Sequence, residues 1–149
     1  MSASENTIDI LLLGSGGREH ALAAKLADSP RCGKLYIAPG NGGTLEVGEN
    51  VALNEADPEA VADFARETGC GLVVIGPEAP LVAGVADAVR AAGIPCFGPG
   101  AEGAQLEGSK LFSKQLMARA DIPTAGYGSF TDEEFALAYV REQGAPGGV

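Results

Sequence analysis

Hydrophobic and polar positions alternate along this chain in short blocks. Four apolar runs, each followed by glycine or proline, are typical of parallel strands covered on both faces; they span residues 8–13, 34–38, 72–75 and 94–97. The stretches between them include three with the apolar spacing of helices, at residues 19–27, 57–68 and 81–92. The pattern therefore predicts alternating strands and helices, in the order β-α-β-α-β-α-β.

The lengths of these blocks predict the fold class. Strands that alternate with helices of about a dozen residues are joined by right-handed crossovers. We therefore expect an α/β fold, with a parallel, doubly wound sheet and helices on both of its faces. Asp57 and Pro58 are typical of a helix start, as an N-cap residue followed by proline at the first helical position, and Gly69 marks the end of that helix.

The same fold class predicts where a ligand would bind. In parallel α/β sheets, ligands lie at the carboxyl ends of the strands. In this chain those ends lead into residues 14–19, 39–44, 76–81 and 98–100, all of which are rich in glycine or proline. The expected ligand site and the main turns of the chain therefore coincide.

The pattern changes after Gly100. We expect a helix at residues 109–119, a possible strand at 126–130 and a capped helix at 131–142. This stretch is too short to bury a core of its own. The chain is therefore divided into an N-terminal substrate-binding α/β domain, residues 1–103, and residues 104–149, a linker helix and the truncated beginning of a second domain.

Composition and charge exclude several functions. Asp and Glu number 20 against 10 Lys and Arg, so the chain, with a net charge of −10, should repel nucleic acids and membranes; such acidity is also compatible with a high-salt cytoplasm. The first apolar run is too short to span a membrane and follows no basic segment, so we expect a cytoplasmic protein without a signal peptide. Cys32, Cys70 and Cys96 are widely spaced and the chain has one histidine. No metal site and no disulfide framework are therefore predicted, and the cysteines are expected to be buried packing residues.

The first turn carries the clearest candidate chemistry. It lies between a strand and a helix, where free backbone N–H groups favour an anion, and consists of Gly14, Ser15, Gly16, Gly17, Arg18 and Glu19. The glycines allow the backbone to approach a phosphate, and Arg18 can bind it with two hydrogen bonds. The alternative is a tight turn beside a solvated arginine. A dinucleotide fingerprint is not met, because Glu19 stands where it requires glycine and the second strand ends in Ala38 and Pro39 without an acid.

The other turns add further candidates, each with an alternative. Asn41, Gly42, Gly43 and Thr44 provide donors for sugar hydroxyls, although Asn-Gly is equally a turn signal. Pro77 and Glu78 place one carboxylate where it can hold an amine or a ribose hydroxyl, or interact with a helix dipole. His20 is a candidate phosphate contact, proton donor or part of a helix cap. Lys110 and Lys114, on the later helix, face either ATP or water. The sequence alone assigns no catalytic residue.

Four segments in this order resemble one enzyme family. They are G-S-G-G-R-E-H-A-L at 14–22, P-G-N-G-G-T at 39–44, G-P-E-A-P-L at 76–81 and E-G-S-K at 107–110. Together they resemble the phosphoribosylamine-glycine ligases of the ATP-grasp superfamily, over residues 8–146. The resemblance implies a Rossmann-like domain before an ATP-grasp domain. It also implies ATP-dependent ligation of glycine to 5-phosphoribosylamine in purine (IMP) biosynthesis, giving glycinamide ribonucleotide, ADP and phosphate.

The resemblance also implies roles for individual residues. Phosphoribosylamine would be held by the loop at residues 14–19, the turn at 41–44, Pro77 and Glu78, and ATP would be contacted by Lys110. Magnesium or manganese would neutralise the phosphates in the full-length enzyme, and neither cofactor is expected to bind tightly to this chain. Family members continue beyond Pro146 into the rest of the ATP-grasp domain. We therefore expect an N-terminal fragment that is inactive alone, of undetermined oligomeric state.

Three other functions remain as alternatives. The first is a free-standing module that binds a phosphosugar without catalysis. The second is another ligase of the same superfamily, biotin-carboxylase-like or formate-dependent. A nicotinamide-binding domain ranks last, because Glu19 and Pro39 interrupt its fingerprint.

Overall fold

The chain forms two compact units. The computed structural model describes residues 7–144; residues 1–6 and 145–149, which include the predicted truncation point after Pro146, lie outside it. The first unit ends at Gly108 and the second begins at Ser109. We describe each unit by itself.

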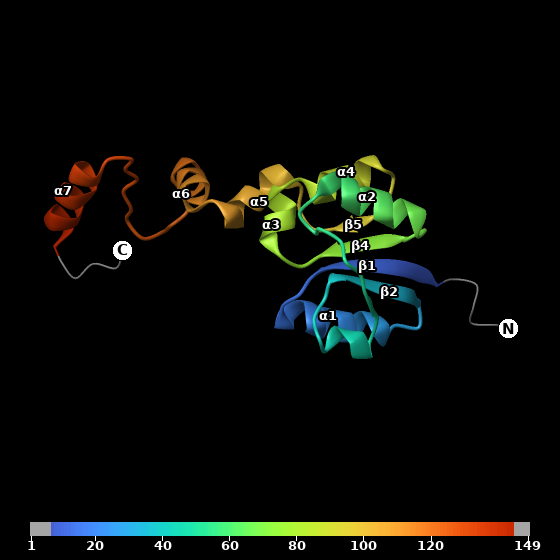
Figure 1. Ribbon diagram of the computed structural model, residues 1–149. Helices are drawn as coiled ribbons and strands as arrows, with labels where there is room; N and C mark the ends of the chain where they lie inside the picture. The colour runs from blue at the N-terminus through green and yellow to red at the C-terminus, as the bar shows by residue number, and fades with distance from the viewer. Residues whose placement is uncertain (1–6, 145–149) are drawn as a thin grey trace. The chain divides into compact units, whose positions relative to one another are not determined.

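The first unit is built on a parallel sheet of five strands (Figure 1). The strands lie in the order β3-β2-β1-β4-β5, and every pairing is parallel. They are β1 (Ile8–Gly14), β2 (Cys32–Pro39), β3 (Glu49–Asn50), β4 (Leu72–Ile75) and β5 (Cys96–Phe97). The predicted parallel sheet is confirmed, and the apolar runs at residues 8–13, 34–38 and 72–75 form its three central strands.

Helices cover both faces of this sheet. In Figure 1, α1 (Gly17–Ala27) lies on one face, and α2 (Pro58–Glu67) and α4 (Val85–Ala91) lie on the other. Because side chains alternate along a strand, Leu11 and Leu13 of β1 join one core cluster and Ile10 and Leu12 join the other. All four are nearly or fully buried, which confirms the doubly wound arrangement.

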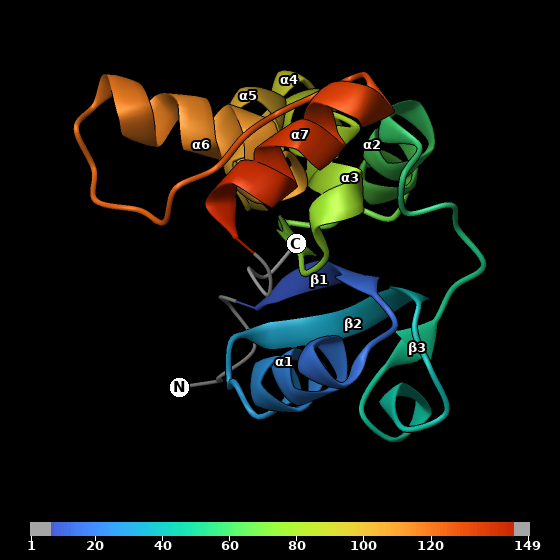
Figure 2. The same ribbon diagram turned by 90° about the vertical axis from the view of Figure 1, so that its left-hand side faces the viewer.

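Two further helices and one 3₁₀ turn complete the first unit. They are η1 (Thr44–Glu46), α3 (Glu78–Val82) and α5 (Ala101–Gly108). The N-cap predicted for α2 is confirmed, because a side-chain oxygen of Asp57 accepts hydrogen bonds from the N–H groups of Glu59 and Ala60. Figure 2 shows the connection from β3 to α2, which passes from the edge of the sheet to its other face.

Two predicted elements differ from the structure. The helix expected at residues 81–92 is two helices, α3 and α4, because Gly84 has a left-handed conformation with φ of 91°. Residues 126–130 form no strand, although all of them are described. Two aromatic side chains of that segment contact the neighbouring helices instead. Tyr127 lies under the ammonium group of Lys114, and Phe130 stacks on Tyr139 with ring centroids 5.2 Å apart.

The second unit has two capped helices and little core. Ser109 caps α6 (Lys110–Arg119) and Asp132 caps α7 (Glu133–Gln143), each by accepting a backbone N–H. Within the described part of the chain, neither helix contains a buried residue. Several large apolar side chains are exposed, including Leu111, Ile122, Phe135, Leu137 and Val140.

Candidate site at the carboxyl edge of the sheet

Three of the predicted loops begin side by side. Gly14, the last residue of β1, pairs with Pro39 of β2, and Leu13 pairs with Ile75 of β4. Strand β1 is also the point from which the strand order runs in opposite directions, β2-β3 on one side and β4-β5 on the other. Loops on the two sides of such a switch point diverge, which is where parallel α/β sheets bind ligands.

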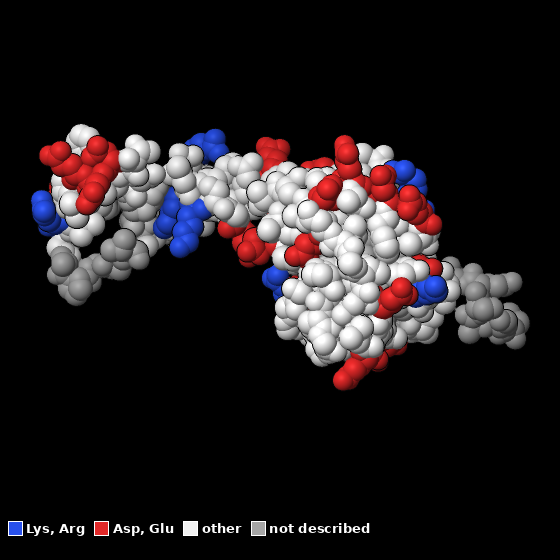
Figure 3. Space-filling model, viewed as in Figure 1, with Lys and Arg blue, Asp and Glu red and all other residues white. Residues whose placement is uncertain are grey.

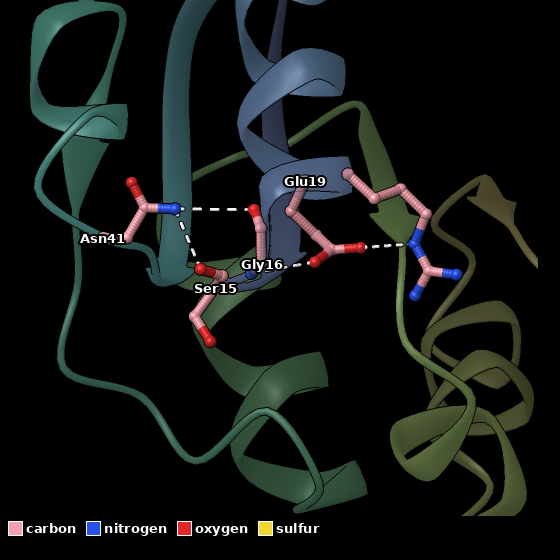
Figure 4. Close-up of polar contacts among 5 residues, drawn as sticks. Ser15, Gly16, Glu19 and Asn41 are labelled. Atoms are coloured by element: carbon pink, nitrogen blue, oxygen red, sulfur yellow. Dashed lines mark hydrogen bonds and ion pairs between the residues drawn. The ribbon is translucent and has the colours of Figure 1, made fainter.

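Asn41 joins the loop after β2 to the loop after β1. Its Nδ2 donates hydrogen bonds to the carbonyl oxygens of Ser15 at 2.8 Å and Gly16 at 3.4 Å (Figure 4). Its Oδ1 accepts hydrogen bonds from the N–H groups of Gly43 at 2.9 Å and Thr44 at 3.1 Å. The side-chain amide is therefore engaged within the protein and shapes both loops.

Thr44 stabilises the loop after β2 through its buried hydroxyl group. Its side chain is fully buried, and Oγ1 lies 2.8 Å from the carbonyl oxygen of Asn41 and 2.6 Å from Oδ1 of Asn50. The imidazole of His20 occupies the space that a side chain at Gly43 would need. Thr44 therefore acts through hydrogen bonds within the loop and His20 through packing. Among the alternatives for His20, this contact favours a structural role.

Glu19 is the most enclosed of the charged candidate residues. It is 4% exposed, Oε2 accepts a hydrogen bond from the N–H of Gly16 at 2.9 Å, and Oε1 accepts one from Nε of Arg18 at 2.7 Å (Figure 4). Burial raises the pKa of this carboxyl, but the hydrogen bonds from Arg18 and Gly16 and the charge of Arg18 hold it below its ordinary value. The group is therefore an ionised, buried carboxylate.

Three glycines make the room for this carboxylate. A Cβ added at Gly14, Gly16 or Gly76 would collide with the Glu19 side chain. We call this enclosure the Glu19 slot; it is formed by Gly14, Gly16 and Gly76. Since Gly76 follows β4, whereas Gly14 ends β1 and Gly16 comes just after it, the slot lies across the switch point.

The remaining groups of the predicted site are at the surface. Ser15, Gly17, Arg18, Gly42 and Glu78 are exposed, and the side chain of Arg18 is 58% exposed. A Cβ added at Gly17 or Gly42 would meet no atom within 4 Å. The first N–H groups of α1 have no partner within the helix, so this surface offers backbone donors beside a guanidinium group.

Pro77 and Glu78 lie on the neighbouring loop. Pro77 is the N-cap of α3 and Glu78 its first residue, so the carboxylate stands at the amino end of a helix. The hydrogen bond and then the charge of Glu19 raise the pKa of Arg18, and burial lowers it. The charge of Glu78 also raises this pKa, but by less than any of these effects. Glu78 therefore shares the electrostatic surroundings of Arg18.

Glu55 belongs to this region but carries no recognisable sequence signal. It lies on the connection from β3 to α2, and its Oε2 is buried without a hydrogen-bond partner among the described residues. Burial, and then the charge of Glu19, raise the pKa of this carboxyl. A glutamate just before a capped helix looks like a solvated acid in the sequence, so its burial was not predictable.

The second unit has an open cleft next to Lys110. The cleft measures about 770 Å³, and its lining includes Lys110, Lys114, Tyr127, Phe130 and Tyr139. Lys114 Nζ donates hydrogen bonds to Thr124 Oγ1 at 2.7 Å and to the carbonyl oxygen of Ala125 at 2.9 Å. Of the two lysines, Lys110 is the one that remains at the surface for a ligand.

Metal binding and membrane insertion have no support in the described residues. Among residues 7–144, no group of three or more histidine, cysteine, aspartate or glutamate side chains could hold a metal ion. The same residues include no helix that is long and apolar enough to cross a bilayer. The three cysteines are free thiols; Cys70 is buried as predicted, whereas Cys32 and Cys96 are partly buried. Burial raises the pKa of all three thiols.

The sequence of this chain is similar to those of known proteins. Residues 8–107 match the family described as Phosphoribosylglycinamide synthetase, N domain. The phosphoribosylamine-glycine ligases of Rhizobium meliloti and Pasteurella multocida are 60% and 56% identical to the chain over 137 and 141 residues. These alignments cover 92% and 93% of this chain but 32% and 33% of those proteins. The chain thus spans about a third of the length of the curated relatives it matches.

Solved structures agree with this relationship. The phosphoribosylamine-glycine ligase of Thermotoga maritima has a TM-score of 0.67 at 26% identity, over 91% of this chain and 30% of that one. An N5-carboxyaminoimidazole ribonucleotide synthetase from Thermus thermophilus has a TM-score of 0.69 at 24% identity, over 92% of this chain and 37% of that one, and shares the fold. A family match over more than half of the chain, supported by this common fold, shows that the chain belongs to the phosphoribosylglycinamide synthetase N-domain family.

Proposed function

We propose that this chain provides the phosphosugar-binding part of an ATP-dependent ligase that joins glycine to 5-phosphoribosylamine in purine biosynthesis. Its relatives of 52–60% identity carry the name phosphoribosylamine-glycine ligase. The single observation that carries the proposal is the exposed start of α1, where Gly17 leaves open space and Arg18 is fixed beside it at the switch point of the sheet. A phosphate would bind there, at the N–H groups of the helix and the guanidinium of Arg18.

The neighbouring loops would bind the rest of the sugar. Ser15 and Gly42 are exposed next to the start of α1, so they lie where ribose hydroxyls would be expected. Pro77 and Glu78 lie across the switch point, where the carboxylate would hold the amine or a ribose hydroxyl. Asn41, Gly43 and Thr44 would keep the loop after β2 in shape.

The second unit would provide the first contact with ATP. Lys110 borders an open cleft within that unit and would contact the phosphates of ATP. The described residues lack a magnesium ligand set, so no step of the reaction is assigned to a metal here. We propose a division into a substrate-binding domain, residues 1–103, and the beginning of an ATP-grasp domain, residues 104–149, in a protein of the cytoplasm.

A ligand-binding experiment tests this proposal. Thermal unfolding of the chain would be followed with ribose 5-phosphate, glycinamide ribonucleotide, ribose and NAD. At a ligand concentration of a hundred times Kd, specific binding stabilises a protein by about 2.7 kcal/mol, which raises Tm by several degrees. We expect this shift with the two phosphorylated ribose ligands and not with ribose or NAD. Equal shifts for all four ligands, or none for any, would contradict the proposal.

The structure also bears on the alternatives. Glu19 stands where the dinucleotide fingerprint requires a third glycine, and it is buried in the slot at the switch point. This arrangement disfavours a nicotinamide-binding domain. A binding module without catalysis would use the same phosphate site. Formation of ADP that depends on glycine, measured on the chain and on a full-length relative, separates binding from ligation.

A further inference from the structure

Arg18 and Glu19 form an unusual pair for neighbours on a helix. Consecutive helical residues point about 100° apart and rarely face one another. Here Nε of Arg18 lies 2.7 Å from Oε1 of Glu19, although the two side chains are 58% and 5% exposed. The guanidinium is thus bound to a carboxylate that is itself inside the protein.

The position of that carboxylate is determined by three glycines and one backbone bond. Gly14, Gly16 and Gly76 form the slot around the Glu19 side chain, and the N–H of Gly16 donates to Oε2. Each oxygen of Glu19 therefore has a protein donor. Because this side chain is only 5% exposed and that of Arg18 is 58% exposed, a ligand would meet Arg18 before the carboxylate.

The hydrogen bond uses only one edge of the guanidinium. It is made through Nε, and no other hydrogen bond of Arg18 occurs among the described residues. The terminal Nη groups therefore remain available on a side chain that is mostly exposed. Two N–H groups of one guanidinium match the spacing of two oxygens of a phosphate.

We propose that Glu19 is a positioning residue, which holds Arg18 so that its terminal N–H groups face the phosphate of the bound sugar. The phosphate part of this inference rests on the proposed function, whereas the fixed orientation of Arg18 does not. Gly76, on the other side of the switch point, also helps to fix Arg18, because a side chain at this position would displace Glu19. The affinity of the phosphate site thus depends on a residue that follows β4.

The orientation of Arg18 can be measured without any ligand. In ¹⁵N NMR spectra, the Nε–H of Arg18 should exchange slowly with water and be rigid on the nanosecond time scale. Arg66 is the internal comparison, since its ion pair with Asp63 uses Nη2 and both side chains are about 60% exposed. In Glu19→Gln, the Arg18 signal should become as mobile as that of Arg66. Equal mobility of the two arginines in the wild-type chain would overturn the proposal.

A double-mutant cycle separates positioning from general stability. We expect Glu19→Gln to weaken ribose 5-phosphate binding by roughly tenfold, the value of one charge-assisted hydrogen bond. In an Arg18→Ala background the same substitution should have almost no effect, because Glu19 acts through Arg18. The control is Glu67→Gln, which removes an exposed carboxylate at the end of α2. An equal loss in both backgrounds would show a merely structural role.

Two further variants keep the test decisive. Gly76→Ala should weaken ribose 5-phosphate binding as Glu19→Gln does, without removing any charge. Arg18→Lys should also weaken this binding, although it keeps the positive charge, because lysine has no Nε to bind Glu19. If Glu19→Gln does not fold, the wild-type NMR comparison and Gly76→Ala still decide the question. If the wild-type chain binds no ribose 5-phosphate, the proposed function fails, while the NMR result still decides the orientation of Arg18.

Discussion

At the scale of single residues, the glycines of the site are of two kinds. Gly14, Gly16 and Gly76 are required by the protein itself, because a side chain at any of them would collide with Glu19. Gly17 and Gly42 face open space and have no such requirement. A glycine that the protein does not need for its own packing is consistent with the close approach of a ligand.

This distinction predicts opposite effects for two alanine substitutions. Gly17→Ala should leave stability unchanged or raise it by up to about 1 kcal/mol, because alanine is the better helix former at the start of α1. It should nevertheless weaken ribose 5-phosphate binding by roughly tenfold if a Cβ intrudes on the phosphate. Urea unfolding and calorimetric titration measure the two quantities.

Gly14→Ala is the matched comparison. Gly14 has φ of 128°, which alanine adopts only with strain, and its Cβ would displace Glu19. We expect a loss of roughly 1–3 kcal/mol in the free energy of unfolding. If both variants bound ligand as tightly as the wild type, Gly17 would not be at the phosphate site.

At the scale of elements, α5 shows how one helix depends on another. A side-chain oxygen of Asp87, on α4, accepts a hydrogen bond from the N–H of Ala101 at 2.8 Å, so the cap of α5 comes from a residue 14 positions earlier. Arg90 of α4 donates hydrogen bonds to the carbonyl oxygens of Cys96, in β5, and of Gly98, on the connection that follows it. Helix α4 therefore holds both the end of the sheet and the start of α5.

Asp87→Ala should destabilise the first unit by about 0.5–2 kcal/mol, the usual cost of losing an N-terminal cap. Asp63→Ala is the control, because among residues 7–144 the partner of Asp63 is Arg66, in an exposed ion pair that contributes about 0–1 kcal/mol. Chemical denaturation of both variants checks the difference. A loss no greater for Asp87→Ala than for Asp63→Ala would contradict the capping role.

These elements also show what the sequence could predict. The strands β1, β2 and β4 were predictable because continuous apolar runs have few alternatives to burial. Helix α5 was not predicted, since its cap lies on another helix, and the break at Gly84 was missed because single glycines are tolerated within helical patterns. The loops of the site were predictable from glycine and proline. The roles of Asn41, Thr44 and Glu19 were not, because they depend on contacts between loops that are distant in the sequence or on enclosure by glycines from two strands.

At the scale of the whole molecule, two features affect stability: its acidity and its uneven core. Figure 3 shows acidic side chains spread over the viewed face of the first unit. Most carboxylates there can be solvated, but Glu55 has an oxygen that is buried and unpaired among the described residues. The buried core is unevenly distributed between the two units. It lies in the first unit, and α6 and α7 contribute no buried residue to it.

Glu55 should make the protein less stable as the pH rises. Its pKa in the folded state is raised above the ordinary 4.5, so the folded state holds the proton more tightly than the unfolded state. The stability linked to this proton is fully present below about pH 4.5 and is lost as the pH rises through the raised pKa. Glu55→Gln should therefore stabilise the chain near neutral pH and have little effect near pH 4.

Thermal unfolding at both pH values tests this sign. Glu19 has the opposite dependence, because its lowered pKa makes it lose stability on acidification, but this contribution is common to both proteins and cancels in their difference. A variant less stable than the wild type near neutral pH would show that the Glu55 carboxylate is paired in solution.

Hydrogen exchange should separate the two units. Amides of β1 and β4 should exchange only on global unfolding, because their side chains form the buried core. Amides of α6 and α7 should exchange within seconds to minutes, since neither helix buries a side chain within the described part of the chain. Mass spectrometry of peptides from residues 8–14 and 133–143 measures this contrast. Equal protection of both peptides would contradict it.

The Glu19 slot also has a consequence for how this family can change in evolution. Four positions in two loops share one small volume: Gly14, Gly16 and Glu19 in the first, and Gly76 in the second. A side chain gained at Gly76 would be tolerated only after Glu19 had become smaller, and a shorter residue at 19 would remove the selection against alanine at 76. Substitutions at these positions should therefore appear together in lineages, and a relative that has lost Glu19 should also have lost the fixed orientation of the arginine beside it.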